Sequence, residues 1–274
     1  VRELEADLVW DGDIRAYHVS LGLRSAVERR ICVEPNLSGI YRFLGDELTM
    51  GEMKLVTLEL LKEDPEVMAY IESGNAHLGV MGFTDHGQRH ASLVAAIAGN
   101  VLERLEYSER DQELASIAGF LHDIGNVAAR CFHAQTGAAI AERLLSSKGM
   151  DPKEVATIIG AIGSHDPEDS SVAVSPVSAA LILADKSDVH RSRVRNEDVH
   201  NFDVHDRVNY AATRSFLKVN HEERSISLQL TVDTAISPVM EYFEIFLTRM
   251  LACKRAAERL ETTFELDINN VRLL

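Results

Sequence analysis

Apolar residues recur at helical spacing over most of the chain between about residues 49 and 205. One such stretch opens with Ser108, followed three residues later by Asp111, which is a helix-capping signal. Its apolar stripe consists of Leu114, Ile117, Ala118 and Leu121. The pattern predicts a helix that ends at the pair His122-Asp123, with this pair continuing the buried stripe inward.

Four other expected helices also carry a metal-competent side chain on an apolar stripe. These residues and their stripe partners are His90 (with Val94, Ile97 and Val101), His133 (with Gly137, Ile140 and Leu144), His165 (with Val155, Ile158 and Ile162) and Asp185 (with Val177, Leu181 and Ala184). Ser175 would cap the last helix, with Pro176 in its first turn. A single buried histidine is usually a hydrogen-bonded core residue, and a single buried aspartate usually pairs with arginine or caps a helix. Five such helices together favour a shared metal ion, because binding to a metal offsets the cost of burying polar side chains on apolar helix faces.

The periodicity changes after about residue 205. Residues 215–219 and 225–232 alternate apolar and polar side chains around a polar turn, which predicts a β-hairpin. A long helix is expected over roughly 237–261, and alternation returns at 263–268. A β-β-α-β region of this size is too small to be stable alone. We expect it to pack on the helices or to form a sheet across a homodimer interface, and to take no part in chemistry.

The first fifty residues show the weakest pattern. Residues 8–10 and 30–33 suggest short strands, and residues 14–27 suggest a partly helical stretch. The expected architecture is therefore mainly α. It comprises an accessory segment over residues 1–50, a helical metal-binding domain over 51–210 and a small α+β region over 211–274.

Charge and composition narrow the class of partner. The net charge of −15 argues against a binding track for a nucleic-acid polymer, which needs clustered Lys and Arg. A metal ion with a few local arginines could still bind a small phosphorylated substrate. No stretch approaches the ~18 apolar residues of a membrane span. The cysteines, Cys32, Cys131 and Cys253, are far apart, so we expect reduced thiols in a cytoplasmic protein and a buried Cys131.

The order His, His-Asp, Asp on consecutive helices resembles the HD-domain superfamily of metal-dependent phosphohydrolases. Here His90, His122-Asp123 and Asp185 carry it, within the runs 85–90 (DHGQRH), 121–125 (LHDIG) and 183–186 (LADK). The resemblance covers roughly residues 55–205 and implies a helical bundle. The run 184–195 is similar to bacterial HD proteins described only as predicted phosphohydrolases. The cyclic-dinucleotide phosphodiesterase branch is disfavoured, because Asn126 stands where that branch has lysine.

The resemblance also implies a ligand set. His90, His122, Asp123 and Asp185 would hold a first metal, and Asp123 would bridge to a second. His133 and His165 fall where dinuclear members, such as the HD hydrolases that split dinucleoside polyphosphates, place ligands for that second metal. Imidazole and carboxylate ligands suit two divalent transition-metal ions, with Fe or Mn expected first and Zn, Co or Ni compatible.

Further candidates surround this set. The expected catalytic residues are Asp123, Lys186 and His86. Lys186 follows a ligand and could take up charge that develops on the phosphoryl group. His86 and Asp188 lie about one helical turn from ligands, where they could orient one or handle protons. The expected phosphate-binding residues are Arg191, Arg193, Arg195 and, more weakly, Arg89. A solvated helix end is the ordinary alternative for the three downstream arginines. The pair His205-Asp206 is interpreted as structural, because it follows the metal-bearing helices.

The expected function is hydrolysis of a phosphomonoester, phosphoanhydride or nucleotide by a metal-activated water. The expected partner is a small, nucleotide-like phosphorylated substrate. Two alternatives stay open. Some HD proteins use the same ligands for a di-iron centre that oxidises small polyols or phosphonates, and an HD module can also be a non-catalytic signalling or assembly domain.

Overall fold

The computed structural model describes the backbone of residues 6–11, 14–19 and 31–33, and then residues 55–166, 172–196 and 198–273. The chain divides into two compact units, Val1–Met53 and Lys54–Leu274. In the first unit, β1 (Ala6–Asp11), β2 (Ile14–Val19) and β3 (Ile31–Val33) form an antiparallel sheet in that order. The expected strands fall on β1 and β3. The helical prediction was wrong over Ile14–Val19, and the rest of the stretch 14–27 lies outside the described residues.

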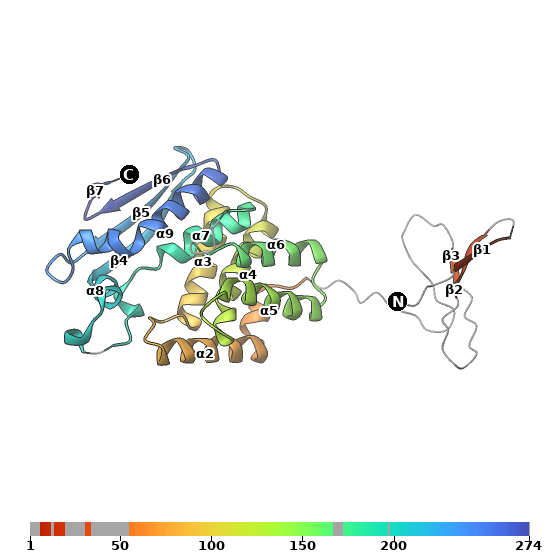
Figure 1. The fold of residues 1–274 in the computed structure, drawn as a ribbon. Helices are drawn as coiled ribbons and strands as arrows, with labels where there is room; N and C mark the ends of the chain where they lie inside the picture. Colours follow the sequence, from red (N-terminus) through yellow and green to blue (C-terminus); the bar gives the residue numbers. More distant parts are fainter. Residues whose placement is uncertain are drawn as a thin grey trace. The chain divides into compact units, whose positions relative to one another are not determined.

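The second unit begins with helices that occupy most of its length (Figure 1). They are α1 (Leu58–Lys62), α2 (Pro65–Val80), α3 (Gln88–Arg104), α4 (Glu109–Leu121), η1 (Ile124–Val127), α5 (His133–Ser147), α6 (Pro152–Gly163), α7 (Pro176–Ser187), η3 (Arg191–Arg193), η4 (Val199–Asn201) and α8 (Val204–Ala211). The Ser108 side chain accepts a hydrogen bond from the Asp111 amide at the start of α4, and Ser175 accepts one from the Ser178 amide at the start of α7. Both expected caps are therefore confirmed.

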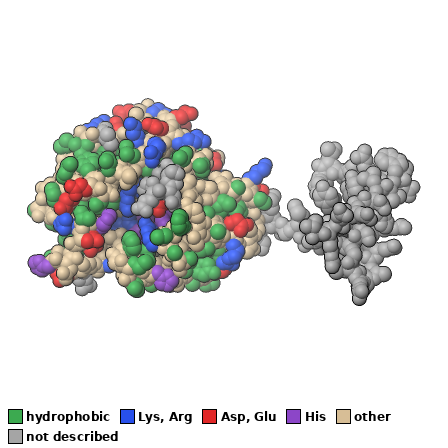
Figure 2. Space-filling view, in the orientation of Figure 1, with side chains coloured by type: hydrophobic (Ala, Val, Ile, Leu, Met, Phe, Trp, Pro, Cys, Tyr) green, Lys and Arg blue, Asp and Glu red, His purple; other side chains and the backbone are tan. Residues whose placement is uncertain are grey.

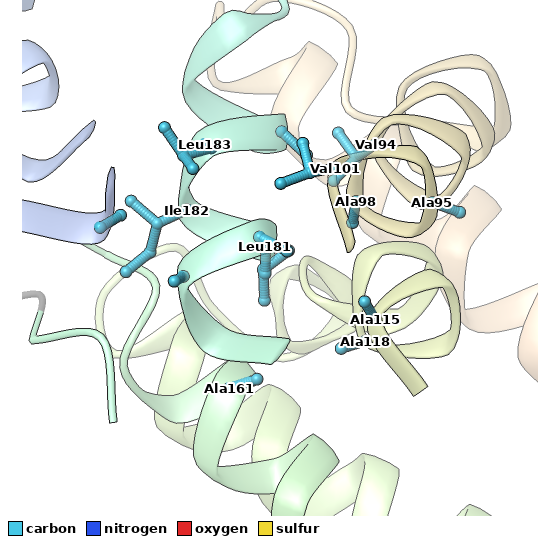
Figure 3. Packing of buried hydrophobic residues seen from close by; sticks show 14 of the residues in the cluster. Val94, Ala95, Ala98, Val101, Ala115, Ala118, Ala161, Leu181, Ile182 and Leu183 are labelled. Carbon is cyan, nitrogen blue, oxygen red and sulfur yellow. The ribbon is translucent and has the colours of Figure 1, made fainter. Parts of the chain in front are cut away.

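Small side chains allow α3, α4 and α7 to pack closely in the core (Figure 3). Ala95 and Ala98 on α3 face Ala115 and Ala118 on α4, and all four are fully buried. A Cβ atom on Gly119 would lie 2.8 Å from the Ala95 Cα atom, so only glycine allows the two backbones to approach this closely. This crossing fixes the distance between the residues at the ends of α3 and α4.

The C-terminal region contains β4 (Ala212–Asn220), β5 (Ser225–Val232), α9 (Val239–Arg259), β6 (Thr263–Ile268) and β7 (Val271–Arg272). The strands form a sheet in the order β4-β5-β6-β7, with β5 and β6 parallel and the other pairs antiparallel. The β-β-α-β prediction is confirmed. It missed the two-residue β7, which follows a turn at Asn269 and Asn270, both with positive φ.

The C-terminal region shares the hydrophobic core of the helices. Leu228 of β5 and Phe246 of α9 belong to the same buried cluster as Leu181 and Leu183 of α7. Helix α9 packs against α7 and against the strands β5 and β6. This packing holds α9 next to the helix that carries Asp185. None of the helices in the described residues is both long enough and apolar enough to cross a membrane.

Candidate metal centre

Four side chains from three helical segments meet at one point in the core. His90 lies in the first turn of α3, His122 and Asp123 directly follow α4, and Asp185 lies near the end of α7. The His90 Nε2 atom lies 3.3 Å from His122 Nε2, 3.8 Å from Asp123 Oδ2 and 3.4 Å from Asp185 Oδ1. The His122 Nε2 atom lies 3.3 Å from Asp123 Oδ2 and 3.6 Å from Asp185 Oδ1. The structure therefore brings together the four residues expected to hold the first metal.

Asp123 faces two groups of ligands with its two oxygen atoms. Its Oδ2 atom faces His122 and His90, and its Oδ1 atom lies 3.4 Å from His133 Nε2. His165 belongs to both groups. It has a ligand atom within 4.8 Å of ligand atoms of Asp123 and His133, and one within 4.8 Å of ligand atoms of His122 and Asp185. A carboxylate with one oxygen on each group can bridge two ions, as the resemblance implied.

The second nitrogen of each ligand histidine is also engaged. The Nδ1 atom of His122 lies 2.8 Å from the Gly119 carbonyl, that of His133 lies 3.1 Å from the Arg130 carbonyl, and that of His165 lies 2.6 Å from the Ile162 carbonyl. A carbonyl oxygen only accepts, so each Nδ1 carries the proton and each Nε2 presents a lone pair to the cluster. This arrangement fixes both tautomer and ring orientation.

A carboxylate holds the remaining ligand histidine. The Nδ1 atom of His90 lies 2.7 Å from Asp188 Oδ2, which also accepts a hydrogen bond of 2.9 Å from Arg89 Nη2. Arg193 Nη1 donates to the Asp188 carbonyl at 2.9 Å. Burial raises the pKa of Asp188, but hydrogen bonds from His90 and the charges of Arg193 and Arg89 outweigh it and hold the pKa well below the usual value. Asp188 is therefore a charged support for His90.

Two glycines allow the second group of ligands to approach. A Cβ atom on Gly125 would lie 2.0 Å from the His133 carbonyl oxygen and 2.5 Å from the Gly137 amide nitrogen. Such contacts are impossible, so only glycine permits η1 to pack directly against the first turns of α5. Phe132 precedes α5 with a φ of 58°, which turns the chain into the helix at His133.

The metal-free cluster holds protons where an ion would bind. Burial lowers the pKa of His122, but the carboxylates of Asp123 and Asp185 outweigh it and raise the pKa to about 10. Burial lowers the pKa of His165 to about 3, with the charge of Lys186 adding to the effect. Burial also lowers the pKa of His133, in spite of Asp123. Without a metal ion, His122 is therefore protonated, whereas His133 and His165 are neutral.

These residues fit a pair of transition-metal ions. With both Nδ1 atoms protonated, the Nε2 atoms of His90 and His122 face each other across 3.3 Å, so a metal ion, or in its absence the extra proton of His122, must lie between them. Ligand atoms separated by 3.3 to 3.8 Å match the spacing around one ion with bonds of about 2.0–2.2 Å. Imidazole and carboxylate donors suit Fe, Mn, Co and Zn better than Ca²⁺, which favours oxygen-only cages.

The two other expected catalytic residues lie beside the cluster. Lys186 is buried, and its Nζ atom bonds the Asp185 carboxylate, so it fixes that ligand. The His86 Nδ1 atom lies 2.7 Å from the Thr84 carbonyl, and the His86 ring centroid lies 5.4 Å from that of His90. Burial and the charge of Arg193 hold the pKa of His86 well below its usual value, so this imidazole is neutral.

A cleft of about 700 Å³ opens beside the cluster, and His86 and Asp166 lie on its wall. Its cations are Arg130, Arg193 and Arg249. In Figure 2, Lys, Arg and His side chains gather near the middle of the face shown. Of the four arginines expected to bind phosphate, Arg193 lines this cleft. The structure adds Arg130 and Arg249, which the sequence patterns did not single out.

The other three expected arginines have different surroundings. Arg89 pairs with Asp85 and Asp188 and lines a separate groove next to α3 and β4. Arg195 Nη2 bonds the side chain of Asn75, and the Arg191 guanidinium lies 5.2 Å from the centre of the Tyr210 ring. Their assignment to phosphate binding stays a prediction.

Two further interpretations of the sequence concern residues on this cleft. His205 and Asp206 line the cleft, together with Asp203, and their structural role stays a prediction. Cys131 was expected to be buried and is exposed on the same cleft, because the turn before α5 directs residues 130–132 outward. Cys253 is buried in α9, and the side chain of Cys32 lies outside the described residues.

Comparison with known proteins identifies the region that carries the cluster. The model of the HD domain matches residues 88–190. The chain is 27% identical over 202 residues to Ribonuclease Y of Campylobacter fetus subsp. fetus (strain 82-40), a match that covers 71% of this chain and 33% of that protein. This chain therefore spans about a third of the length of that relative. A solved structure described as a predicted HD superfamily hydrolase, from an uncultured Thermotogales bacterium, is 25% identical, with a TM-score of 0.36 over 48% of this chain and 73% of that chain.

Proposed function

Residues 88–190 of this chain form an HD domain, and we propose that the chain is a metal-dependent phosphohydrolase acting on a phosphomonoester, a phosphoanhydride or a nucleotide. The observation that carries the proposal is the convergence of six ligands beside a cleft lined by three arginines. The six are His90, His122, Asp123, His133, His165 and Asp185. A non-catalytic module would need neither the paired ligand groups nor an adjacent cleft with three arginines on its walls.

Two divalent ions bound here would clamp phosphoryl oxygens and lower the pKa of a water molecule. The protein contributes the geometry. Asp188 and three backbone carbonyls orient the imidazoles, and Lys186 holds Asp185. Arg193 would stabilise negative charge that develops on the phosphoryl group. Neutral His86, with its Nδ1 proton committed to Thr84, leaves Nε2 as a proton or hydrogen-bond acceptor on the cleft wall.

The oxygenase alternative, oxidation of a small polyol or a phosphonate, uses the same ligands. The arginines of the cleft would suit a phosphonate as well as a phosphate, so the cleft argues against the polyol alone, and the assay with and without oxygen tests the phosphonate. Three arginines match a phosphate, because guanidinium groups bind phosphate oxygens with paired hydrogen bonds. A small uncharged polyol would not require them. The cleft therefore supports phosphate chemistry over polyol oxidation.

The similarity to Ribonuclease Y raises RNA as a further substrate, since the name of that relative denotes RNA cleavage. The net charge of −15 disfavours an extended track for a polymer. We propose a small phosphorylated substrate, and the test below includes an oligoribonucleotide for this reason.

The test begins with protein purified without added metal, whose metal content is measured by elemental analysis. The protein is then loaded with Mn²⁺ or Fe²⁺ and assayed on nucleotides, phosphomonoesters, dinucleoside polyphosphates and an oligoribonucleotide, with and without oxygen. Asp123→Ala is the inactive control, and Asp198→Asn, at the exposed residue that caps the start of η4, is the active control. Phosphate release that requires metal and proceeds without oxygen supports the proposal. Turnover that requires oxygen, or none with any phosphoester, contradicts it.

A further inference from the structure

Arg249 comes from the C-terminal region and lies on the cleft beside the metal-binding cluster. Its helix α9 packs against α7, which carries Asp185 and Lys186. The neighbouring Phe246 and Met250 are buried, so the position of Arg249 along the helix is fixed by core packing. Its guanidinium lies 4.6 Å from the centre of the Phe246 ring. The side chain is therefore held over an aromatic surface at the cleft wall.

Arg249 has no partner of opposite charge in the part of the chain that the structure describes. No carboxylate of these residues lies within 4.0 Å of its guanidinium, and no hydrogen bond joins it to them. By contrast, Arg207, which contacts the same helix, donates two hydrogen bonds of 3.0 Å to Glu241. Burial lowers the pKa of Arg249, Asp185 raises it, and Arg193 and Arg130 lower it. An unpaired, partly buried cation among other cations is costly.

The three arginines of the cleft come from distant parts of the chain. Arg130 follows η1, Arg193 ends η3 and Arg249 lies in α9. Arg130 lies 3.3 Å from Asn126 Oδ1 and 4.0 Å from Asp123 Oδ1, so its charge is only weakly satisfied. Asp166, Asp203 and Asp206 line the same cleft, and Arg193 lies 3.7 Å from Asp188 Oδ2, whereas Arg249 has no carboxylate of the described residues within 4.0 Å. An anion bound between Arg130 and Arg249 would supply the charge partner that Arg249 lacks.

We propose that Arg249 is a substrate-binding residue that donates hydrogen bonds to an anionic oxygen of the substrate. The C-terminal region would thereby set affinity at the active site, contrary to the expectation from the sequence that it has no role there. The anion is a phosphate group in the cleft, and Arg130 and Arg193 are the other cations of the same subsite. The assignment of this anion to a substrate rests on the proposed phosphohydrolase function, whereas anion binding itself does not.

The test is direct binding of inorganic phosphate and of pyrophosphate to the metal-loaded full chain, by calorimetry. The variants are Arg249→Gln and Arg249→Lys, with Arg255→Gln as the matched control, because Arg255 is exposed on the same helix. A charge-assisted contact predicts that Arg249→Gln weakens binding about tenfold to hundredfold, while metal content stays unchanged. Arg249→Lys should give an intermediate loss, because lysine keeps the charge without the planar fork. Arg255→Gln should bind as the parent protein does.

Unchanged phosphate affinity in Arg249→Gln would overturn the inference. If that variant fails to fold, parental affinity in Arg249→Lys would overturn it instead. Failure of the proposed function would look different. The parent protein would then hydrolyse no phosphoester but would bind phosphate, and Arg249→Gln would bind it more weakly. If the parent does hydrolyse a substrate, Arg249→Gln should raise KM at least tenfold. An unchanged KM would refute the inference while the function stands.

Discussion

The two expected metal positions are built in different ways. Most ligands of the first come from helices: His90 and Asp185 lie within α3 and α7, and His122 caps the end of α4. The second depends on helix ends, since His133 is the first residue of α5 and His165 follows α6 by two residues. A ligand within a helix is placed by the packing of that helix, whereas a ligand at its end also depends on the adjoining turn.

The contacts that support the ligands differ in the same sense. In the first position, His90 Nδ1 lies 2.7 Å from the carboxylate of Asp188, and His122 Nδ1 bonds a carbonyl. In the second position, His133 and His165 bond carbonyls, and the nearest carboxylate oxygen, that of Asp166, lies 3.4 Å from His133 Nδ1. A carboxylate makes the attached imidazole a stronger ligand. Asp123 is the element that both positions share. We therefore expect the first ion to bind more tightly than the second, with Asp123 coupling them.

Replacing the shared residue has the largest expected effect. Asp123→Ala removes an oxygen from each position and leaves His122 without its nearest carboxylate. Both ions should be lost and turnover should fall to background. Elemental analysis after desalting measures the ions, with Asp198→Asn as the control that keeps two. If the alanine variant retained both ions, Asp123 would not be the bridge and the comparison of the two positions would fail.

A glycine substitution tests whether the second position depends on its turn. A Cβ atom at Gly125 would lie 2.0 Å from the His133 carbonyl, so Gly125→Ala must displace η1 from α5. We expect a destabilisation of about 1–3 kcal/mol and loss of the second ion, with the first retained. Gly160→Ala is the matched control, because its Cβ would meet its nearest neighbour at an ordinary 3.7 Å.

Thermal unfolding and metal analysis of both glycine variants decide the outcome. The control should be neutral or slightly stabilised, because alanine favours a helix over glycine. Two ions bound with parental affinity in Gly125→Ala would show that the turn does not position His133.

The sequence predicts helix-borne features well for a physical reason. A buried stripe with a period of 3.6 residues assigns His90 and Asp185 to the core side of their helices, and the structure places them there. The same periodicity predicted the mainly helical fold and the C-terminal change to strands. The partly helical stretch expected from residue 14 was wrong over Ile14–Val19, because these residues form a strand that pairs with β1 and β3. A short amphipathic stretch does not determine its own pairing.

The cleft was much less accessible to prediction. Arg249 lies on the polar side of a long helix, where an arginine ordinarily faces solvent, and nothing local distinguishes it from Arg255. Only the packing of α9 on α7 brings it to the cleft. Arg130 offers a weak signal, since it lies three residues before the expected ligand His133. The exposed Cys131 was missed because a left-handed φ at Phe132 cannot be read from hydrophobicity.

A smaller effect is expected for the carboxylate that orients His90 in the first position. Asp188→Asn keeps the size of the side chain but removes the charge that orients His90. The affinity for the first ion should fall about tenfold to hundredfold, with the second less affected. Arg89→Gln is the matched control: it removes a contact to Asp188 but leaves the His90 hydrogen bond intact. Chelator competition measures both, and equal losses in the two variants would assign the effect to general disruption.

The smallest expected effect is the pH dependence of metal affinity. It should differ between the two positions, because the two ions displace different numbers of protons. In the metal-free protein the pKa of His122 is about 10, so this ligand is protonated at neutral pH and the first ion must displace its proton. The apparent affinity for that ion should therefore rise with pH, by up to about tenfold per unit below pH 10. His165, with a pKa of about 3, and His133, with a lowered pKa, are already neutral at pH 7. The second ion should thus bind with nearly constant affinity between pH 7 and 9.

Mn²⁺ titrations of His133→Ala report on the first ion, and titrations of the parent protein with the first position filled report on the second. If the affinities for the two ions changed equally with pH, binding of each ion would displace the same number of protons, and the two positions would not differ in this respect.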